Sequence, residues 1–357
     1  MQGKMRHYFW GVHTARGFFS LYESNLQDVD EVVVIKGSLR VIKSKILETI
    51  AKEYAAKGHE VECIHCASDN NALDGVIIPA LKTAFTVNDL DHTGRTKVIN
   101  SDPILNLSRL IEKDIRRMYV QNINRIIQKA HRSFKRGLEI HDGLEEIYIN
   151  SMDFHRADKL TGNLVQEIIG RKRNPGKKGR TKHRFFGAST PRGVVDYIPD
   201  LTEDVKKRYL IKGRAGTGKS TLLKKVAHFS EEAGFDVEMY HCGFDPHSID
   251  MVIIRELGIC LFDSTDPHEY FPEQEEDQII DLYTETVMPE TDEKYAVAIN
   301  ELTKLYKSYM KQGITYLKEA KTVNDQFERS ILNEAENLNV KDIYDICREV
   351  LEKQGES

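Results

Sequence analysis

The sequence predicts an α/β protein built from two consecutive copies of one unit, each a parallel β-sheet flanked by helices and followed by a helical extension. Residues 6–92 align without a gap with residues 182–268, and about 27 of the 87 paired residues are identical, against the ~6% expected by chance from average composition. Within each copy, apolar runs of strand length alternate with an amphipathic helix, a rhythm typical of parallel sheets with crossover helices. Residues 104–170 and 272–354 then turn rich in Glu, Lys, Leu and Ile at helical spacing.

The second copy gives the clearest order of elements. A hairpin is expected over 185–195, followed by a strand over 208–211, a glycine-rich turn, a helix that ends near Gly234 and a second strand over 236–242. The helix has one apolar face, formed by Leu222, Leu223, Val226 and Phe229. We therefore divide the chain into 1–170, a basic linker at 171–184, and 185–357. The apolar positions of the two extensions are expected to pack on the sheets or on each other, with a partner-binding coiled coil as the alternative.

Composition limits the classes of protein. A length of 357 residues suits two domains, and 40% hydrophobic with 30% charged residues is typical of a globular chain. We expect no membrane partner, because no apolar run approaches the ~20 residues of a membrane helix, and no signal peptide, because the first residues are not apolar. Five cysteines, an odd and sparse set, favour a cytoplasmic protein without a disulfide framework. The oligomeric state is open.

Residues 213–220 match the pattern G-x-x-x-x-G-K-[ST] between an apolar strand and an amphipathic helix. This context predicts the P-loop NTPase fold, in which glycines let backbone N–H groups wrap around phosphate oxygens. The expected nucleotide-binding residues are Gly213, Arg214, Ala215, Gly216, Thr217, Gly218, Lys219, Ser220 and Thr221. Lys219 should reach the β- and γ-phosphates, and the Ser220 hydroxyl should ligate Mg²⁺.

The first copy retains Lys43 and Ser44 but has Arg40 and Ile42 where the second has Gly216 and Gly218. A β-branched residue beside the lysine hinders close approach of backbone and phosphate. We therefore interpret residues 37–44 as a degenerate site. The alternative is a looser anion site that uses Lys36, Arg40 and Lys43.

Residues 259–263, four apolar residues followed by Asp263, suit a Walker B strand whose carboxylate holds Mg²⁺ through water. The first copy has Val87 at the position of Asp263, so the copy that lost the loop glycines also lost this carboxylate. The asymmetry predicts one working site per chain, with Lys219 and Asp263 as its catalytic residues.

Two further acidic residues are candidates for catalysis. Asp245 follows the second strand and could act as a general base assisted by His241. His241, Cys242 and Asp245 also persist in the first copy, which favours structural roles for His241 and Cys242 and leaves Asp245 open. Glu256 is absent from the first copy and is the competing candidate for polarising the attacking nucleophile.

Two other patterns have structural readings as well as functional ones. Cys63 and Cys66 form a C-x-x-C pattern without a second ligand pair, so we interpret them as buried strand residues. Residues 171–184 contain eight Lys or Arg. This run is either a solvated linker or a contact for the phosphates of nucleotide or nucleic acid.

Taken together, residues 185–193, 211–221, 241–250 and 257–268 resemble an uncharacterised bacterial family of two-copy P-loop ATPases, found mainly in Firmicutes and labelled as nucleotide kinases. The resemblance spans nearly the whole chain and implies the fold rather than a substrate. In such relatives the first copy can also have an intact loop, which this chain lacks.

The sequence thus predicts an ATP-binding, kinase-like P-loop NTPase with Mg²⁺ that hydrolyses ATP or transfers its γ-phosphoryl group to a small molecule or nucleotide. ATP is preferred over GTP because the Asn-Lys-x-Asp element of guanine recognition is absent from the sequence. One alternative is a regulatory or scaffolding module in which ATP orders the helical extensions for a partner. Another is an ATPase stimulated by nucleic acid, which rests on the basic run alone.

Overall fold

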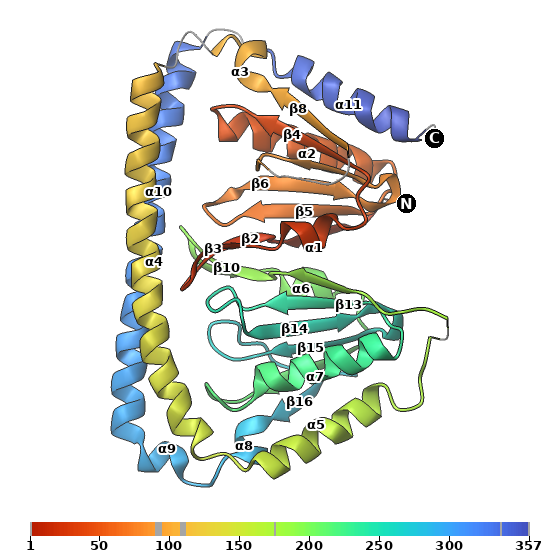
Figure 1. Cartoon of the computed structure of the whole chain (residues 1–357), viewed down its shortest axis with the longest axis vertical. Coiled ribbons are helices and arrows are strands. Elements are labelled where there is room, and N and C mark those ends of the chain that lie inside the picture. The colour runs from red at the N-terminus through yellow and green to blue at the C-terminus, as the bar shows by residue number, and fades with distance from the viewer. Residues whose placement is uncertain (1, 90–94, 108–111, 175, 336–337, 356–357) are drawn as a thin grey trace.

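The structure is a computed structural model and describes residues 2–89, 95–107, 112–174, 176–335 and 338–355. Two α/β units each contain one six-stranded mixed sheet (Figure 1). The strand order is β1-β5-β6-β7-β4-β8 in the first unit and β16-β12-β15-β14-β13-β9 in the second, which gives equivalent strands equivalent places. The α/β class and the internal duplication are confirmed.

The elements of the first copy repeat in the second in the same order. The first copy has β1 Met5–Tyr8, β2 Gly11–Thr14, β3 Gly17–Ser20, α1 Tyr22–Leu26, β4 Glu31–Lys36, α2 Arg40–Ala56, β5 Val61–Cys66, β6 Asp69–Ile78, β7 Thr83–Thr86 and β8 Arg95–Asn100. The second has β9 Thr181–Arg184, β10 Gly187–Thr190, β11 Gly193–Asp196, α6 Ile198–Thr202, β12 Lys207–Lys212, α7 Lys219–Glu232, β13 Val237–His241, β14 Ile249–Ile254, β15 Ile259–Asp263 and β16 Gln278–Asp281. Short 3₁₀ helices at Pro79–Leu81 and Arg255–Leu257 precede β7 and β15.

The expectation of wholly parallel sheets is wrong. β12 runs parallel to β15 and β16, but β14 is antiparallel to both β13 and β15, and β6 has the same place in the first sheet. The short connections from β5 to β6 and from β13 to β14 explain this, because a parallel pair needs a crossover of about a dozen residues or more. β16 lies in a region expected to be helical and was missed.

The two copies meet through their edge strands. Phe9 and Phe185 exchange backbone hydrogen bonds of 2.9 and 3.0 Å, just beyond β1 and β9. Arg184 of β9 is buried and donates to Glu62 of β5, and its guanidinium lies over the Tyr8 ring. One hydrophobic cluster also contains residues of both sheets. The copies are therefore joined by a packed interface.

The extensions contain α3 Ser101–Ile104, α4 Lys113–Ile149 and α5 Phe154–Ile168 after the first copy, and α8 Leu282–Thr286, α9 Thr291–Lys294, α10 Ala296–Glu334 and α11 Lys341–Gly355 after the second. The long helices α4 and α10 run antiparallel side by side along both units (Figure 1). Gly313 permits this approach, because a Cβ there would lie 2.2 Å from the Phe134 ring. The extensions thus pack on each other, as one of the expectations had it.

The extensions also change partners. α5, which follows the first copy, packs against α7 of the second, and Leu164, Ile168 and Ile169 belong to the hydrophobic cluster of the second sheet. α11, which follows the second copy, contacts α2 and places Ile343 and Cys347 in the cluster of the first sheet. Each packed unit therefore combines one sheet with the helical end of the other copy's extension, across the sequence division at 170.

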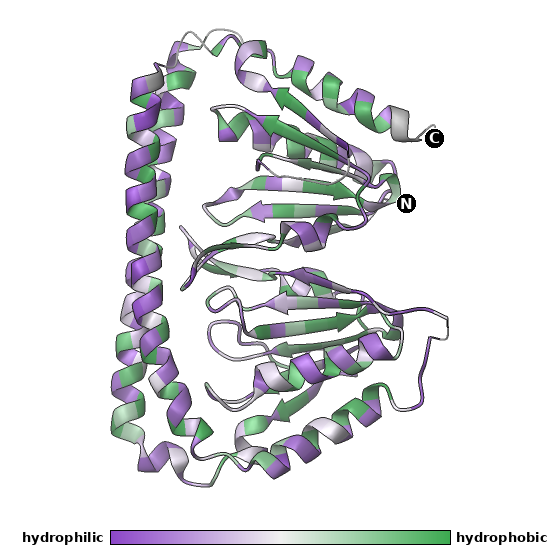
Figure 2. Cartoon of the chain, in the orientation of Figure 1, coloured by the Kyte–Doolittle hydropathy of each residue, from purple (hydrophilic) through white to green (hydrophobic). Residues whose placement is uncertain are grey.

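Hydropathy follows this arrangement. The strands are largely hydrophobic, whereas α4 and α10 alternate hydrophobic and hydrophilic residues (Figure 2). In the described part of the chain, none of the helices combines the length and the apolar character needed to span a bilayer.

Candidate functional site

The loop between β12 and α7, residues 213–220, is called the glycine loop here. Gly216 and Gly218 adopt positive φ angles of 75° and 86°, a conformation that residues with side chains rarely adopt. Gly218 is the N-cap of α7, so the loop ends on the free N–H groups of the first helical turn. Such amides, together with the helix dipole, favour an anion at this position.

Lys219 and Asp263 lie together beside the loop. β12 and β15 pair in parallel with Ile211 opposite Asp263, which brings that carboxylate to the edge of the sheet where the loop begins. Lys219 Nζ lies 3.7 Å from Asp263 Oδ2 and donates to the Arg214 carbonyl at 2.7 Å. The sequence-predicted pair is therefore brought together.

The remaining loop residues have varied surroundings. Ser220 Oγ accepts from the Ile249 amide at 2.9 Å, and Ser44 makes the same bond to Leu73 in the first copy. This contact is structural in both copies, and the hydroxyl keeps a second lone pair. Thr217 is buried and donates to the Arg214 carbonyl, whereas the side chain of Arg214 turns to Asp292 at 2.8 Å. Ala215 is partly buried and Thr221 is exposed.

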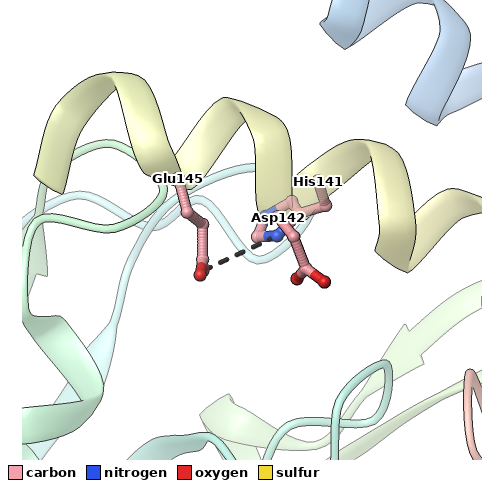
Figure 3. A group of neighbouring side chains, drawn as sticks. All are labelled: His141, Asp142 and Glu145. Atoms are coloured by element: carbon pink, nitrogen blue, oxygen red, sulfur yellow. Dashed lines mark ion pairs between the residues drawn. The ribbon is translucent and has the colours of Figure 1, made fainter. Parts of the chain in front are cut away.

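Sequence reasoning missed a group of side chains that α4 brings to the glycine loop. A Cβ on Gly216 would lie 2.6 Å from the backbone carbonyl of Glu145, so α4 packs directly on the loop. His141, Asp142 and Glu145 project from this part of the helix, with His141 Nδ1 3.6 Å from Glu145 Oε1 (Figure 3). These residues follow the first copy in sequence but lie beside the glycine loop of the second copy. The only signal was a faint match to Asn324, Asp325 and Glu328 of α10, 183 residues further along the chain rather than at the 176-residue spacing of the repeat.

Burial and neighbouring charges shift the pKa values of His141 and Glu145. Burial, and then the positive charge of Lys219, lower the pKa of His141. Burial and the nearby Asp142 carboxylate raise the pKa of Glu145. Tyr306 of α10 covers the same region, with its ring centroid 5.2 Å from that of His141. Helices of both extensions therefore line the site.

Asp250 stands directly across from Asp263. The register of β14 and β15 pairs Met251 with Phe262, and the next pair outward is Asp250 and Asp263. Burial, and then the Asp263 charge, raise the pKa of Asp250 above its ordinary value. Like charges directly opposite in antiparallel strands are unfavourable unless a cation compensates them.

Asp245 belongs to the rim of the site. Its carboxylate accepts from Arg16 Nε at 2.9 Å, an arginine of the β2–β3 hairpin of the first copy. It also accepts from the His247 amide, as Asp69 does from Asn71 in the first copy. The turn role is thus shared by both copies, and the arginine contact adds a cation near the glycine loop.

Glu256 is not part of this site. Its carboxylate accepts from Lys177, Asn174 and the Asp236 amide. It precedes β15, whereas Asp263 ends that strand, so about 17 Å of strand separate the two. The proposed role of Glu256 in polarising a nucleophile is wrong, because β15 runs from Glu256 toward the glycine loop.

The contacts of His241 agree with the structural role that its persistence in the first copy favoured. His241 Nδ1 donates to the Pro246 carbonyl at 2.6 Å, and its Nε2 accepts from His183 Nδ1 at 2.8 Å. His7 and His65 form the equivalent pair in the first copy at 2.8 Å. Cys63 and Cys66 are buried free thiols, as interpreted from the sequence.

The segment of the first copy that aligns with the glycine loop is helical. α2 begins at Arg40, the counterpart of Gly216, so it starts one turn earlier than α7. The carboxylate of Glu328, from α10, accepts from the amides of Arg40 and Val41 at 2.7 and 3.2 Å. Lys43 Nζ donates to the Gly37 carbonyl. The anion position at this helix start is therefore filled by the protein itself.

Much of the basic run is occupied within the chain. Lys177 pairs with Asp236 and Glu256, Arg180 and Lys182 pair with Asp28, and Arg184 pairs with Glu62. β9 takes up the last four residues of the run, and Pro175 lies outside the described residues. The interpretation of the whole run as a solvated linker is therefore wrong for residues 181–184, which form an edge strand of the second sheet with Arg184 buried, and the ion pairs occupy four of the eight basic residues of the run.

Comparison with models of known protein families, with curated protein sequences and with solved structures finds no match to this chain. The argument for function therefore rests on the geometry of the glycine loop and its surroundings.

Proposed function

We propose that this chain binds ATP with Mg²⁺ at the glycine loop and hydrolyses it or transfers its γ-phosphoryl group. The observation that supports this most directly is the geometry of residues 213–220, with Gly216 and Gly218 at positive φ, Lys219 beside Asp263, and the start of α7 at the loop. Oriented amides and one lysine at the carboxyl edge of parallel strands suit a triphosphate. The resemblance to two-copy P-loop ATPases agrees with this proposal.

Each residue has a defined part in the proposal. The loop amides and Lys219 bind the β- and γ-phosphates, and Ser220 and Asp263 hold Mg²⁺, which neutralises charge that develops on the transferred group. Arg16 brings a second cation to the rim, held by Asp245. Catalysis by such a site consists mainly of positioning and charge stabilisation.

α4 supplies the groups for proton transfer. Glu145 and His141 lie on the helix that packs on Gly216, and a carboxyl of raised pKa beside a neutral imidazole suits general-base work near neutral pH. The acceptor of the phosphoryl group is either water or a small molecule. Both reactions use the same base.

A specific observation also favours the regulatory alternative. α4 contacts the glycine loop and runs beside α10 along both units (Figure 1). A ligand that moves the loop would therefore also move a helix that packs against the first copy. Slow turnover combined with nucleotide-dependent association with a partner would favour this role. Stimulation by nucleic acid loses some support, because four of the eight basic residues of the run are engaged in ion pairs within the chain.

Calorimetric titration of MgATP into matched lysine variants tests the proposal. Lys219→Ala should abolish measurable binding, because it removes the cation nearest the phosphates. Lys43→Ala, the equivalent change in the first copy, should retain wild-type affinity. Undiminished ATP affinity in Lys219→Ala would refute the proposal.

A further inference from the structure

In the first copy, the segment that aligns with the glycine loop is occupied by two charged side chains, the cation of Arg40 and the anion of Glu328. The second copy has neither at this position. The guanidinium of Arg40 pairs with Asp74 of β6, a carboxylate that is only 5% exposed. The carboxylate of Glu328 occupies the first amides of α2. Both the buried carboxylate of Asp74 and the amides at the start of α2 therefore have partners from within the protein.

The second copy retains the carboxylate and the helix-start amides that Arg40 and Glu328 bind in the first copy. Asp250 is the counterpart of Asp74, but Gly216 replaces Arg40, and no lysine or arginine among the described residues forms an ion pair with Asp250. Glu145 of α4 lies against Gly216 as Glu328 of α10 lies against Arg40, but it pairs with His141 rather than with loop amides. Over the described ranges, no side chain accepts from the amides of Gly216 or Thr217, the counterparts of Arg40 and Val41, although the Thr217 amide donates to the Arg214 carbonyl at 3.4 Å.

The carboxylate opposite this position also differs between the copies. In the first copy the Val87 amide donates to the Asp74 carbonyl, one position beyond the pair of Gly75 and Thr86, and in the second copy Asp250 and Asp263 follow the pair of Met251 and Phe262 in the same way. The copy that lacks the internal arginine therefore has two opposed carboxylates instead of one. Two carboxylate oxygens from neighbouring strands are ligands that a hard divalent cation prefers.

We propose that Asp250 is a cation-binding carboxylate of the glycine-loop site, so that a divalent cation between Asp250, Asp263 and a bound phosphate takes the place that Arg40 has in the first copy. The phosphate takes the place of the Glu328 carboxylate. This inference rests on the proposed function, and it assigns to the metal a residue beyond Ser220 and Asp263. Arg40 and Glu328 act as built-in substitutes for the cation and the anion.

The test is a titration of the protein with a fluorescent ATP analogue, once in Mg²⁺ and once in EDTA. The ratio of the two affinities for the analogue measures how much the cation contributes to binding. In the wild type, Mg²⁺ should raise the affinity for the analogue by about tenfold or more, a typical coupling between two ligands. Asp250→Asn should reduce this enhancement to less than about threefold and should leave or improve binding in EDTA, because it removes a charge that repels the phosphates. Asp250→Glu, which keeps the carboxylate, should retain part of the enhancement.

The matched control is Asp74→Asn in the first copy, which should leave the Mg²⁺ enhancement unchanged. Thermal unfolding without nucleotide checks that each variant is folded. If Asp250→Asn does not fold, Asp250→Ser provides a smaller replacement. Full Mg²⁺ enhancement in folded Asp250→Asn or Asp250→Ser overturns the inference, and so does loss of binding in EDTA. Absence of analogue binding by the wild type in both conditions instead refutes the proposed function, and the inference with it.

Discussion

Replacing Glu328 with alanine should destabilise the first copy, although the residue lies near the end of α10, far away in sequence. Its carboxylate accepts from two backbone amides at the start of α2 and is only 7% exposed. Hydrogen bonds to a buried charged group contribute about 1.5–3 kcal/mol each, and the change leaves two donors and the nearby Lys43 without their anion. We expect a loss of about 3 kcal/mol in the free energy of unfolding.

Trp10 makes this loss measurable. It is the single tryptophan of the chain and is fully buried in the cluster shared by the two sheets, so its fluorescence follows unfolding of the first copy together with its interface to the second in urea. With a urea dependence of about 3 kcal/mol per M, a loss of about 3 kcal/mol lowers the midpoint by about 1 M.

The control for Glu328→Ala is Glu145→Ala on α4, because Glu145 lies against Gly216 as Glu328 lies against Arg40. The Glu145 side chain is 38% exposed and, among the described residues, forms an ion pair with His141 alone, so its removal should cost less than about 1 kcal/mol. Equal midpoints for the two variants, or a shift below about 0.2 M for Glu328→Ala, would refute the account of the first copy as a site filled from within.

Three further predictions follow from the structure. Burial lowers the pKa of His241 to about 4, so the unfolded chain binds a proton below pH 6.5 that the folded chain excludes; stability should fall by about 1.4 kcal/mol per pH unit for this residue between pH 6.5 and 4. Urea midpoints at pH 7.5 and 5.5 should show a smaller loss for His241→Asn than for the wild type, and an equal loss would contradict this. Arg16→Ala should lower ATP turnover by about 10²-fold while changing ATP affinity little, and unchanged turnover would remove Arg16 from the site. Gly216→Ala should cost at least about 1–2 kcal/mol in thermal unfolding, from its positive φ and the contact with Glu145, whereas Gly143→Ala in α4 meets nothing within 4 Å and should be neutral or stabilising; equal stability of the two variants would show that α4 does not press on the loop.

The sequence was sufficient where the information was local or repeated. The gapless repeat placed equivalent strands correctly, and the helix expected to end near Gly234 is α7, which ends at Glu232. The contrast between Gly216 and Arg40 also anticipated that the first copy lacks the loop, because side chains do not tolerate the positive φ that the turn needs.

Features that depend on long-range packing were beyond sequence reasoning. An apolar strand such as β14 has the same pattern whether its neighbours are parallel or antiparallel, so only the short connection before it indicated its direction. The exchange of α5 and α11 left no local signal, because an amphipathic face does not specify which sheet it covers. The contribution of Glu145 to the glycine loop was hidden for the same reason. Glu256 was chosen for its absence from the first copy, although it lies at the wrong end of β15.

A structure of the protein with Mg²⁺ and a non-hydrolysable ATP analogue tests the central claim most directly. The account predicts one nucleotide per chain, with its phosphates on residues 213–220 and Lys219, while Glu328 remains on the amides of Arg40 and Val41. A nucleotide bound at Lys43, with Glu328 displaced and the glycine loop empty, would contradict it.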